Sequence, residues 1–436
     1  MPDHDVIVII YTTLYRKGGH QFPQVAETLG RDKKAAGFDG KIILRAVESK
    51  RDVLQVLAEI MESGKRIKEF HFVGHSGMYG PMFGTVAMPE QFSPYEWEHL
   101  QIPFADDGSA YFHCCRSARW FAPFFARTFK VTSYGFFWYT TFSKSKTHYR
   151  FAGSNGSGDL YTIGCKGRKS HGLGASALKF AGVMPAEQMR AFQPEAPSDT
   201  SYDRVAELYD EAFIDIRVRK DEWKWLNEHL PASDRLTILD IGCGNGALLN
   251  ALSERIEHGV GVDESAGVIE RAKLRNAKSE NLEFKKIDGP VLPFPDNSFD
   301  VITSLMSFRY LDWDPLLLEI KRVMKPGGKF LIVDMVTVPV KVSEYPHLLK
   351  DKLRTMRNQK KNARFDEALS KLVSHPDWKK MLEFNPIRSE HEMKWYLESR
   401  FPGQKAEILN MGWNSRIIAF DSGPVENGVQ VKLSYP

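Results

Sequence analysis

The chain has 436 residues, of which 42% are hydrophobic, and this length and composition predict two domains with cores of their own. The net charge of +4 is small for this length, which argues against a dedicated nucleic-acid binder but leaves a local basic patch open. Near the start, the apolar run at residues 6–11 is too short for a signal peptide or a membrane span.

The number and spacing of the cysteines indicate the redox compartment and whether a metal site is expected. The four cysteines are Cys114, Cys115, Cys165 and Cys243. Two of them are adjacent, which suits no disulfide framework, and the sequence contains no C-x-x-C pair for zinc. We therefore expect a protein of the reducing cytoplasm without a metal site.

Short apolar runs alternate with helical patterns over residues 1–192, and this alternation predicts an α/β domain with right-handed βαβ units. The predicted strands are residues 6–11, 41–47, 70–73, 109–113 and 131–134. The predicted helices are residues 22–36, 50–63 and 118–127. Ser49 is a good N-cap for the second of these helices. The glycine-rich stretches 153–158 and 164–174 are predicted to be loops.

Two reactive residue types follow neighbouring strands of this predicted sheet. His75 lies in a Gly-His-Ser-Gly stretch after strand 70–73, and Cys115 follows strand 109–113 in a Cys-Cys-Arg-Ser stretch. The carboxyl ends of adjacent parallel strands are where open α/β sheets place their sites. A thiol beside an imidazole is the pair that a cysteine nucleophile needs.

These two stretches, about forty residues apart, resemble those of the caspase-like (clan CD) cysteine peptidases. The resemblance implies Cys115 as the nucleophile, His75 as general base or leaving-group acid, and the N–H groups of Gly77 and Cys115 as oxyanion donors. His113 stands where many relatives carry an acidic residue, which puts a preference for basic P1 residues in doubt. The alternative is an inert buried cysteine and a histidine that only bonds the loop, in a silent docking module.

Residues 193–200 contain prolines and small polar residues, which predict a linker to a second α/β domain at residues 201–423. The predicted strands of that domain are residues 236–240, 259–262, 282–287, a run within 294–304, 329–334, 406–411 and 415–420. The predicted helices are residues 202–210, 220–229, 247–254, 266–278 and 315–324. Residues 325–328 are expected to form a sharp turn, and residues 424–436 a short tail or an added strand.

A glycine-rich turn follows the first of these strands. Its residues are Asp240-Ile-Gly242-Cys-Gly244-Asn-Gly246. Glycines let the backbone turn sharply and let a ligand lie against it, while the helix behind offers free N–H groups to a carboxylate. The Gly-x-Gly-x-Gly spacing differs from the Gly-x-Gly-x-x-Gly of dinucleotide folds. The stretch resembles the first motif of class I S-adenosylmethionine (SAM) methyltransferases, which implies that Asp240 and the three glycines bind the cofactor.

Later residues extend this resemblance. Asp263 ends the second strand about twenty residues after the turn, and Asp288 follows the third strand. The resemblance implies that Asp263 accepts hydrogen bonds from the ribose hydroxyls and Asp288 from the adenine amino group. It also implies that Tyr209 closes over SAM and that Ser304, with residues 305–310 after it, lies near the transferred methyl. For Tyr209, an ordinary aromatic core contact is the alternative.

Two further stretches refine the expected activity. The block at residues 319–330 resembles the quinone and small-molecule branch of these methyltransferases. Residues 340–400 are predicted to be a helical insertion that caps the acceptor pocket. Because this insertion is basic, it favours an anionic acceptor, although a solvated helix face explains the same charges.

We therefore expect two doubly wound α/β domains, a caspase-like sheet followed by a Rossmann-like, seven-stranded methyltransferase sheet. The expected activity is methyl transfer from SAM to an oxygen or nitrogen atom of a small molecule or peptide. Two alternatives stay open: a Cys115/His75 peptidase with an accessory methyltransferase, and a silent first domain that recruits the acceptor. We expect neither nucleic acid nor membrane as a partner, and a homodimer stays open.

Overall fold

The computed structural model describes residues 5–16, 19–151, 158–165, 177–179, 181, 183–184, 186–195, 201–338, 342–360, 363–384, 387–412 and 415–426. The chain divides into two compact units, unit 1 reaching Ser198 and unit 2 beginning at Asp199. Parts of the predicted linker (196–200), of the predicted loops (153–157 and 166–174), of the start of the insertion (340–341) and of the tail (427–436) lie outside the described residues.

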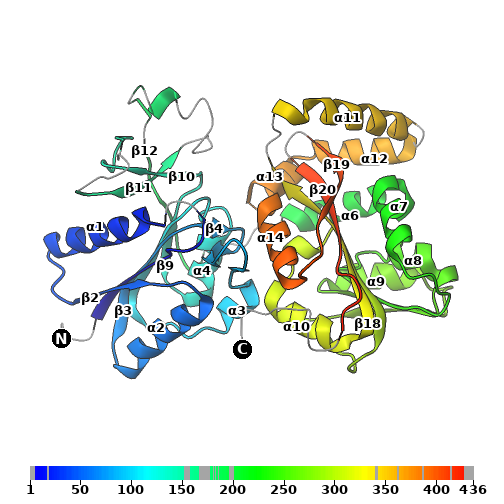
Figure 1. Ribbon diagram of the computed structural model, residues 1–436, viewed down its shortest axis with the longest axis horizontal. Coiled ribbons are helices and arrows are strands. Elements are labelled where there is room, and N and C mark those ends of the chain that lie inside the picture. The colour runs from blue at the N-terminus through cyan, green and yellow to red at the C-terminus, as the bar shows by residue number, and fades with distance from the viewer. Residues whose placement is uncertain are drawn as a thin grey trace. The chain divides into compact units, whose positions relative to one another are not determined.

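Unit 1 is built on a six-stranded sheet with the strand order β13-β9-β8-β3-β1-β2 (Figure 1). Its strands are β1 (Asp5–Tyr11), β2 (Lys41–Ala46), β3 (Arg66–Val73), β8 (Phe104–His113), β9 (Thr132–Gly135) and β13 (Arg190–Phe192). Five strands run parallel, and β13 pairs antiparallel with β9 at the edge. The parallel strands follow the order 2-1-3-4-5 of a doubly wound sheet, as the sequence predicted for this half.

Helices cover both faces of this sheet (Figure 1). They are α1 (Gln21–Ala35), α2 (Lys50–Glu62), α3 (Pro94–Glu98) and α4 (Phe121–Phe129). Successive residues of β1 point to opposite faces, so Ile9 packs with Phe22 of α1 while Val8 packs in the core under α2 and α4. The predicted N-cap is confirmed, because Ser49 and Asp52 form a reciprocal capping box at the start of α2.

Short strands surround the carboxyl edge of this sheet. They are β4 (Ser76–Gly77), β5 (Gly80–Pro81), β6 (Phe83–Gly84), β7 (Pro89–Glu90), β10 (Thr140–Ser143), β11 (Tyr161–Cys165) and β12 (Ala186–Glu187). The first two residues of the expected loop 164–174 are not in a loop. Gly164 and Cys165 end β11, which pairs with β10 and β12. The pairing is long-range, so the glycine pattern alone did not reveal this strand.

Unit 2 contains a seven-stranded sheet with the order β16-β15-β14-β17-β18-β20-β19. Its strands are β14 (Thr237–Ile241), β15 (His258–Asp263), β16 (Leu282–Lys286), β17 (Phe299–Leu305), β18 (Met324–Thr337), β19 (Glu407–Met411) and β20 (Ser415–Asp421). The first five run parallel, whereas β20 lies antiparallel between β18 and β19. The predicted closing hairpin is therefore present, and the sharp turn expected at residues 325–328 lies within the long β18.

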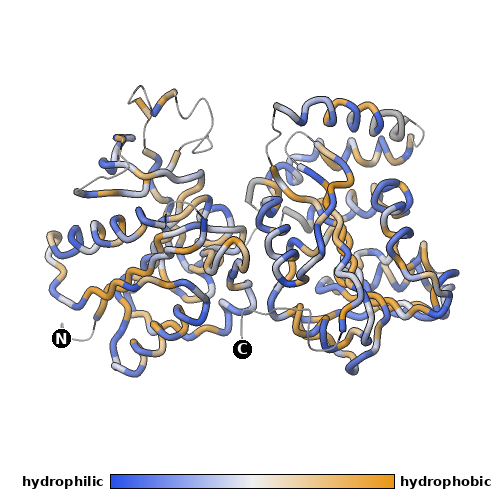
Figure 2. The backbone as a smooth tube through the Cα atoms, in the orientation of Figure 1, coloured by the Kyte–Doolittle hydropathy of each residue, from blue (hydrophilic) through white to orange (hydrophobic). Residues whose placement is uncertain are grey.

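The helices of unit 2 lie on both faces of the sheet. They are α6 (Ser201–Ala212), α7 (Lys220–His229), α8 (Ala247–Leu252), α9 (Ala266–Arg275), α10 (Trp313–Val323), α11 (Tyr345–Lys360), α12 (Ala363–Ser374), α13 (Pro376–Phe384) and α14 (Glu390–Arg400), with the short turns η1 (Ile216–Val218), η2 (Ser253–Arg255), η3 (Phe308–Tyr310) and η4 (Val342–Glu344). One core holds Leu249 of α8 against Ile238, and the other holds Leu317 of α10 against Ile302. Figure 2 shows hydrophobic residues along strands such as β18.

The predicted insertion at residues 340–400 has two different parts. Helix α14 belongs to the main core, because its apolar residues Met393, Tyr396 and Leu397 are buried against the sheet. The other helices of this segment, α11, α12 and α13, lie outside this core, and we refer to these three helices as the cap. The cap is therefore shorter than the predicted insertion. In the described part of the chain, no helix is both long and apolar enough to cross a membrane.

Candidate functional site

The glycine turn between β14 and α8 has a backbone that favours glycine. Gly242, Gly244 and Gly246 have φ angles of 70°, 54° and 75°, in the left-handed region that side chains disfavour. A Cβ on Gly242 would lie 2.4 Å from the Cβ of Ser307, whereas a Cβ on Gly244 would meet nothing within 4 Å. The turn is therefore packed on one side and open at Gly244.

Asp263 borders this open side. It ends β15, which pairs with β14. Its Oδ2 accepts a hydrogen bond from the N–H of Gly244 at 3.2 Å, and its Oδ1 accepts from the N–H of Ser265 at 3.0 Å. The strand order thus brings a carboxylate predicted from sequence spacing into direct contact with the predicted glycine turn.

Asp240, the last acidic residue of β14, is buried beneath the turn. Its pKa is raised to about 7, chiefly by burial. The hydrogen bond from Thr303 lowers the pKa, whereas the charge of Asp263 raises it. The Thr303 hydroxyl donates to Asp240 Oδ1 at 2.7 Å. Asp240 therefore changes charge near neutral pH, close to where the sequence predicts a cofactor.

Ser304 is placed differently from the expectation. Its side chain is fully buried, and its hydroxyl donates to the carbonyl of Ile241 at 3.1 Å and contacts the Ser307 hydroxyl at 2.8 Å. Ser307 donates to the same carbonyl at 2.9 Å. These two serines tie the end of β17 to the glycine turn, so Ser304 supports the turn from below. No sequence pattern predicted this contact of Ser307, because it depends on the pairing of β17 with β14.

The other two predicted cofactor residues lie on separate elements. Asp288 follows β16, and its side chain is 90% exposed and pairs with Lys286. Tyr209 lies on α6, where its hydroxyl accepts from Arg219 Nη2 at 3.5 Å and its ring contacts Phe213 at 4.8 Å. Tyr209 therefore makes the aromatic contact that was the alternative, and it still presents its hydroxyl to an arginine.

Negative charge collects beside the turn. Burial raises the pKa of the Glu264 carboxyl, the charges of Asp312, Asp263 and Asp288 raise it further, and the charge of Lys286 lowers it. Lys286 also pairs with Asp288, so part of this negative charge is compensated.

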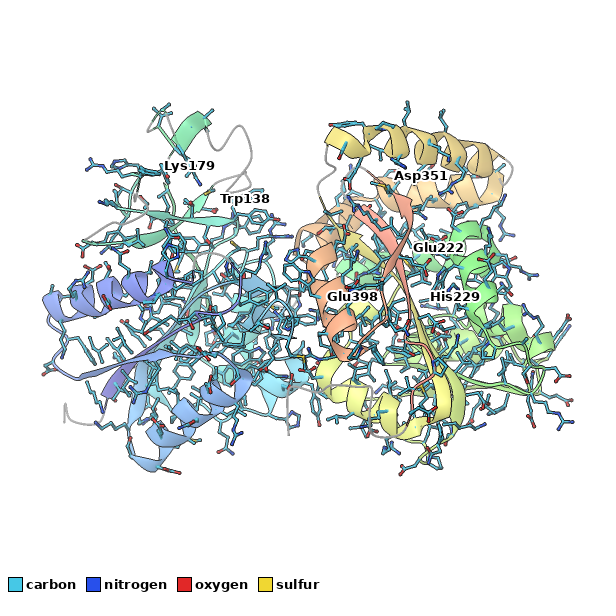
Figure 3. The ribbon with its side chains drawn as sticks, in the orientation of Figure 1. Trp138, Lys179, Glu222, His229, Asp351 and Glu398 are labelled. Atoms are coloured by element: carbon cyan, nitrogen blue, oxygen red, sulfur yellow. The ribbon has the colours of Figure 1, made fainter. Side chains whose placement is uncertain are left out.

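The cap is joined to the rest of unit 2 by packing and ion pairs. Asp351 lies on the side of α11 that faces β19 (Figure 3), accepts from the N–H of Met411 at 3.1 Å and pairs with Arg354 at 3.0 Å. Arg354 also pairs with Asp221 at 3.0 Å. Among the predicted basic residues of this cap, Lys350 is exposed to solvent. Lys350 fits the alternative of a solvated helix face, whereas Arg354 is held by ion pairs within unit 2.

Unit 1 brings its two predicted residues to one sheet edge. His75 follows β3 and Cys115 follows β8, and these strands are neighbours. The sulfur of Cys115 lies 3.3 Å from the N–H of Thr140 and 3.2 Å from its hydroxyl. The ring of His75 packs edge-on against Phe22 at 5.2 Å. Gly77, the predicted oxyanion donor, belongs to the β4–β5 hairpin.

Residues 239–332 match the methyltransferase domain family. This stretch of unit 2 is therefore similar to a methyltransferase domain. A demethylmenaquinone methyltransferase from Clavibacter sepedonicus is 33% identical over 159 residues, which cover 35% of this chain and 64% of that protein. The sterol 4-C-methyltransferase strm-1 from Caenorhabditis elegans is 30% identical over 135 residues, which cover 30% of this chain and 39% of that protein. This chain thus spans less than two thirds of either relative.

A solved structure also aligns with this chain. The SAM-dependent methyltransferase from Aquifex aeolicus has 22% sequence identity and a TM-score of 0.32, and the match covers 46% of this chain and 89% of that one. The match to the methyltransferase domain family supports SAM, the cofactor predicted from the sequence, as the cofactor of unit 2. The residues present fit SAM: the turn is open at Gly244, and a carboxylate borders it.

Proposed function

We propose that unit 2 transfers a methyl group from SAM to an oxygen or nitrogen atom of a small molecule or peptide. The observation that carries this proposal is the contact between Asp263 and the open glycine turn at Gly244. The names of the two relatives, a demethylmenaquinone and a sterol 4-C-methyltransferase, favour a small-molecule acceptor, and the second names a carbon rather than an oxygen or nitrogen as the methylated atom of its own acceptor. The acceptor is therefore expected to bind beside the turn, at the carboxyl edge of the sheet.

Five of the predicted residues have a direct role in this proposal. Asp263 accepts hydrogen bonds from the ribose hydroxyls, and Asp288 from the adenine amino group. The backbone of Gly242, Gly244 and Gly246 lies against the cofactor. When bound, SAM supplies a sulfonium that makes its methyl group electrophilic. The protein then has to orient the acceptor in line with that methyl group and to exclude water.

Replacing Asp263 tests the cofactor assignment. In Asp263→Ala, we expect SAM affinity to fall about tenfold to hundredfold, since hydrogen bonds to a carboxylate are among the strong ones. Isothermal titration calorimetry measures the change. Glu270→Ala is the matched control, because Glu270 is an exposed acid on α9 that pairs with Lys273. Unchanged affinity in Asp263→Ala would refute the ribose assignment, provided that both variants melt as the wild type does.

A second candidate function belongs to unit 1, which we propose as a cysteine peptidase. Cys115 is partly exposed, whereas Cys114, Cys165 and Cys243 are buried, and burial raises the pKa of Cys114 to about 12. Only a thiol that solvent and substrate reach serves as a nucleophile. Cys115 also shares its sheet edge with His75, which would act as the base.

Cys115→Ala separates the two activities. If unit 1 is a peptidase, this variant loses the cleavage of a fluorogenic peptide library and keeps the methylation measured with labelled SAM and a cell extract. If unit 1 is a silent scaffold that recruits the acceptor, neither wild type nor variant cleaves any peptide, and both methylate equally. Cleavage that persists in Cys115→Ala would rule out this cysteine as the nucleophile.

A further inference from the structure

Helix α11 of the cap carries a row of exposed apolar side chains. Leu349 and Leu353 are 62% and 50% exposed, and Tyr345 is 47% exposed. These positions are four residues apart, so the three side chains follow one side of the helix and form what we call the apolar row. Single exposed apolar residues are ordinary on a protein surface, but a contiguous group of them marks a surface that meets a partner.

The other side of α11 is held by unit 2. Leu348 is only 3% exposed, and Asp351 accepts a hydrogen bond from the N–H of Met411 in β19 at 3.1 Å. Arg354 pairs with Asp221 of α7 at 3.0 Å. Figure 1 shows α11 at the outer end of unit 2. The helix is therefore anchored through one side, and the apolar row lies on a side that solvent reaches.

Positive charge accompanies the apolar row. Residues 345–364 contain a single acid, Asp351, and many basic residues. The basic residues are Lys350, Lys352, Arg354, Arg357, Lys360, Lys361 and Arg364. Lys350 and Arg364 are exposed and form no ion pair within the described part of the chain. Although Arg354 is held by two acids, the stretch as a whole keeps a strong positive charge.

This combination of apolar and basic residues points to a lipid surface. In a helix that lies in the membrane interface, the apolar side chains enter the acyl boundary while lysines and arginines contact anionic headgroups. A solvated helix face would explain the cations, but not leucines that are half exposed or more. A nucleic acid would likewise use the charge, which is bound through phosphates, and leave the apolar row without a role.

The size of this face argues against a protein partner. Helix α11 has 16 residues. A helix of this length is about 24 Å long and about 10 Å wide, so one face covers roughly 240 Å². Each partner in a stable protein interface buries about 800 Å². A second copy of this chain would also place one basic stretch against the other, because a two-fold interface pairs the same patch with itself.

We propose that α11 docks unit 2 on the surface of a membrane that contains anionic lipids. This inference goes beyond the proposed methyl transfer and does not rest on it. It departs from the sequence expectation of no membrane partner, which was based on the lack of long apolar runs. No helix in the described residues is long and apolar enough to span a bilayer, but a helix that lies in the interface needs only one apolar side.

Vesicle flotation of the full chain tests this docking. We expect wild type to bind vesicles with about 30% phosphatidylserine at least about tenfold more tightly than vesicles of phosphatidylcholine alone. High salt should weaken this binding, because it screens the attraction between lysines and headgroups. We expect Leu349→Ser/Leu353→Ser to bind the phosphatidylserine vesicles about tenfold more weakly than wild type. Lys350→Gln should bind them about threefold to fivefold more weakly.

Leu274→Ser/Leu318→Ser is the matched control, because these leucines of α9 and α10 are 78% and 47% exposed. It should bind the phosphatidylserine vesicles within about twofold of wild type, since it changes exposed leucines elsewhere on unit 2. All these variants change exposed residues, so thermal melting should match that of wild type. Equal binding of wild type to both vesicles, binding to neither, or unchanged binding of Leu349→Ser/Leu353→Ser would each overturn the proposal. Self-association that this variant abolishes, without vesicle binding by wild type, would assign the apolar row to a second copy instead.

Discussion

Two aspartates of unit 2 differ in burial although they flank the same turn. Asp263 lies at the edge and bonds Gly244, whereas Asp240 is buried and its pKa is raised to about 7. The cause is desolvation, because the single hydroxyl of Thr303 replaces only part of the water that an ionised carboxylate prefers. At the residue scale, Asp240 is therefore the group most sensitive to a nearby positive charge.

SAM affinity is expected to rise with pH because of Asp240. Below about pH 7 this carboxyl is protonated and neutral, and above it the carboxylate attracts the cationic cofactor. From pH 6 to 8 we expect the affinity of wild type to rise several-fold, up to about tenfold, relative to that of Asp240→Asn. Calorimetry of both proteins at each pH measures the ratio of their SAM affinities. Protonation of SAM itself affects both affinities equally, so it cancels in this ratio. A ratio that stays constant across this range would contradict the prediction.

The folded-state pKa of Asp240 also affects stability. Because it lies above the unfolded value, the folded protein binds a proton more tightly between about pH 4 and 7. The resulting stabilisation is present at low pH and is lost as pH rises through 7. A bound cofactor that favours the ionised form offsets this loss, so the buried acid couples cofactor binding to the folding of the turn.

At the element scale, the cap rests on the first helix of unit 2. Ala368 and Leu372 of α12 are buried against Val205 and Ala212 of α6. An ion pair at 2.7 Å joins Arg204 of α6 to Asp377 of α13. Because α6 and the cap share buried contacts and this ion pair, they are expected to move together.

Substituting one buried residue tests this packing. We expect Leu372→Ala to lower the free energy of unfolding by about 2–5 kcal/mol, because it leaves a cavity between α12 and α6. Val373→Ala, the adjacent and 45% exposed position, should change it by less than about 0.5 kcal/mol. Urea denaturation, monitored by fluorescence, measures the free energy of unfolding of both variants. Equal losses for the two variants would show that α12 does not rest on α6 as described.

At the scale of the whole molecule, both units follow one rule of parallel sheets. Their predicted site residues come after strands β3 and β8 in unit 1 and after β14 and β15 in unit 2. In each case the strands are neighbours in the sheet, so residues distant in sequence meet at the carboxyl edge. Each unit also has hydrophobic clusters of its own, so each can hold its own sheet edge and the residues predicted there.

The sequence by itself determined the two α/β units, most of their strands and helices, and the pairing of the glycine turn with Asp263. These features follow from local periodicity, glycine positions and strand order, which the amino-acid pattern expresses directly. Only the tertiary structure decided that Ser304 is buried, that Asp240 titrates near neutrality, and that α14 belongs to the core. It also decided that Asp334 holds the buried Arg309 in an ion pair. Burial and charge neighbours depend on contacts between distant elements, and no local pattern records them.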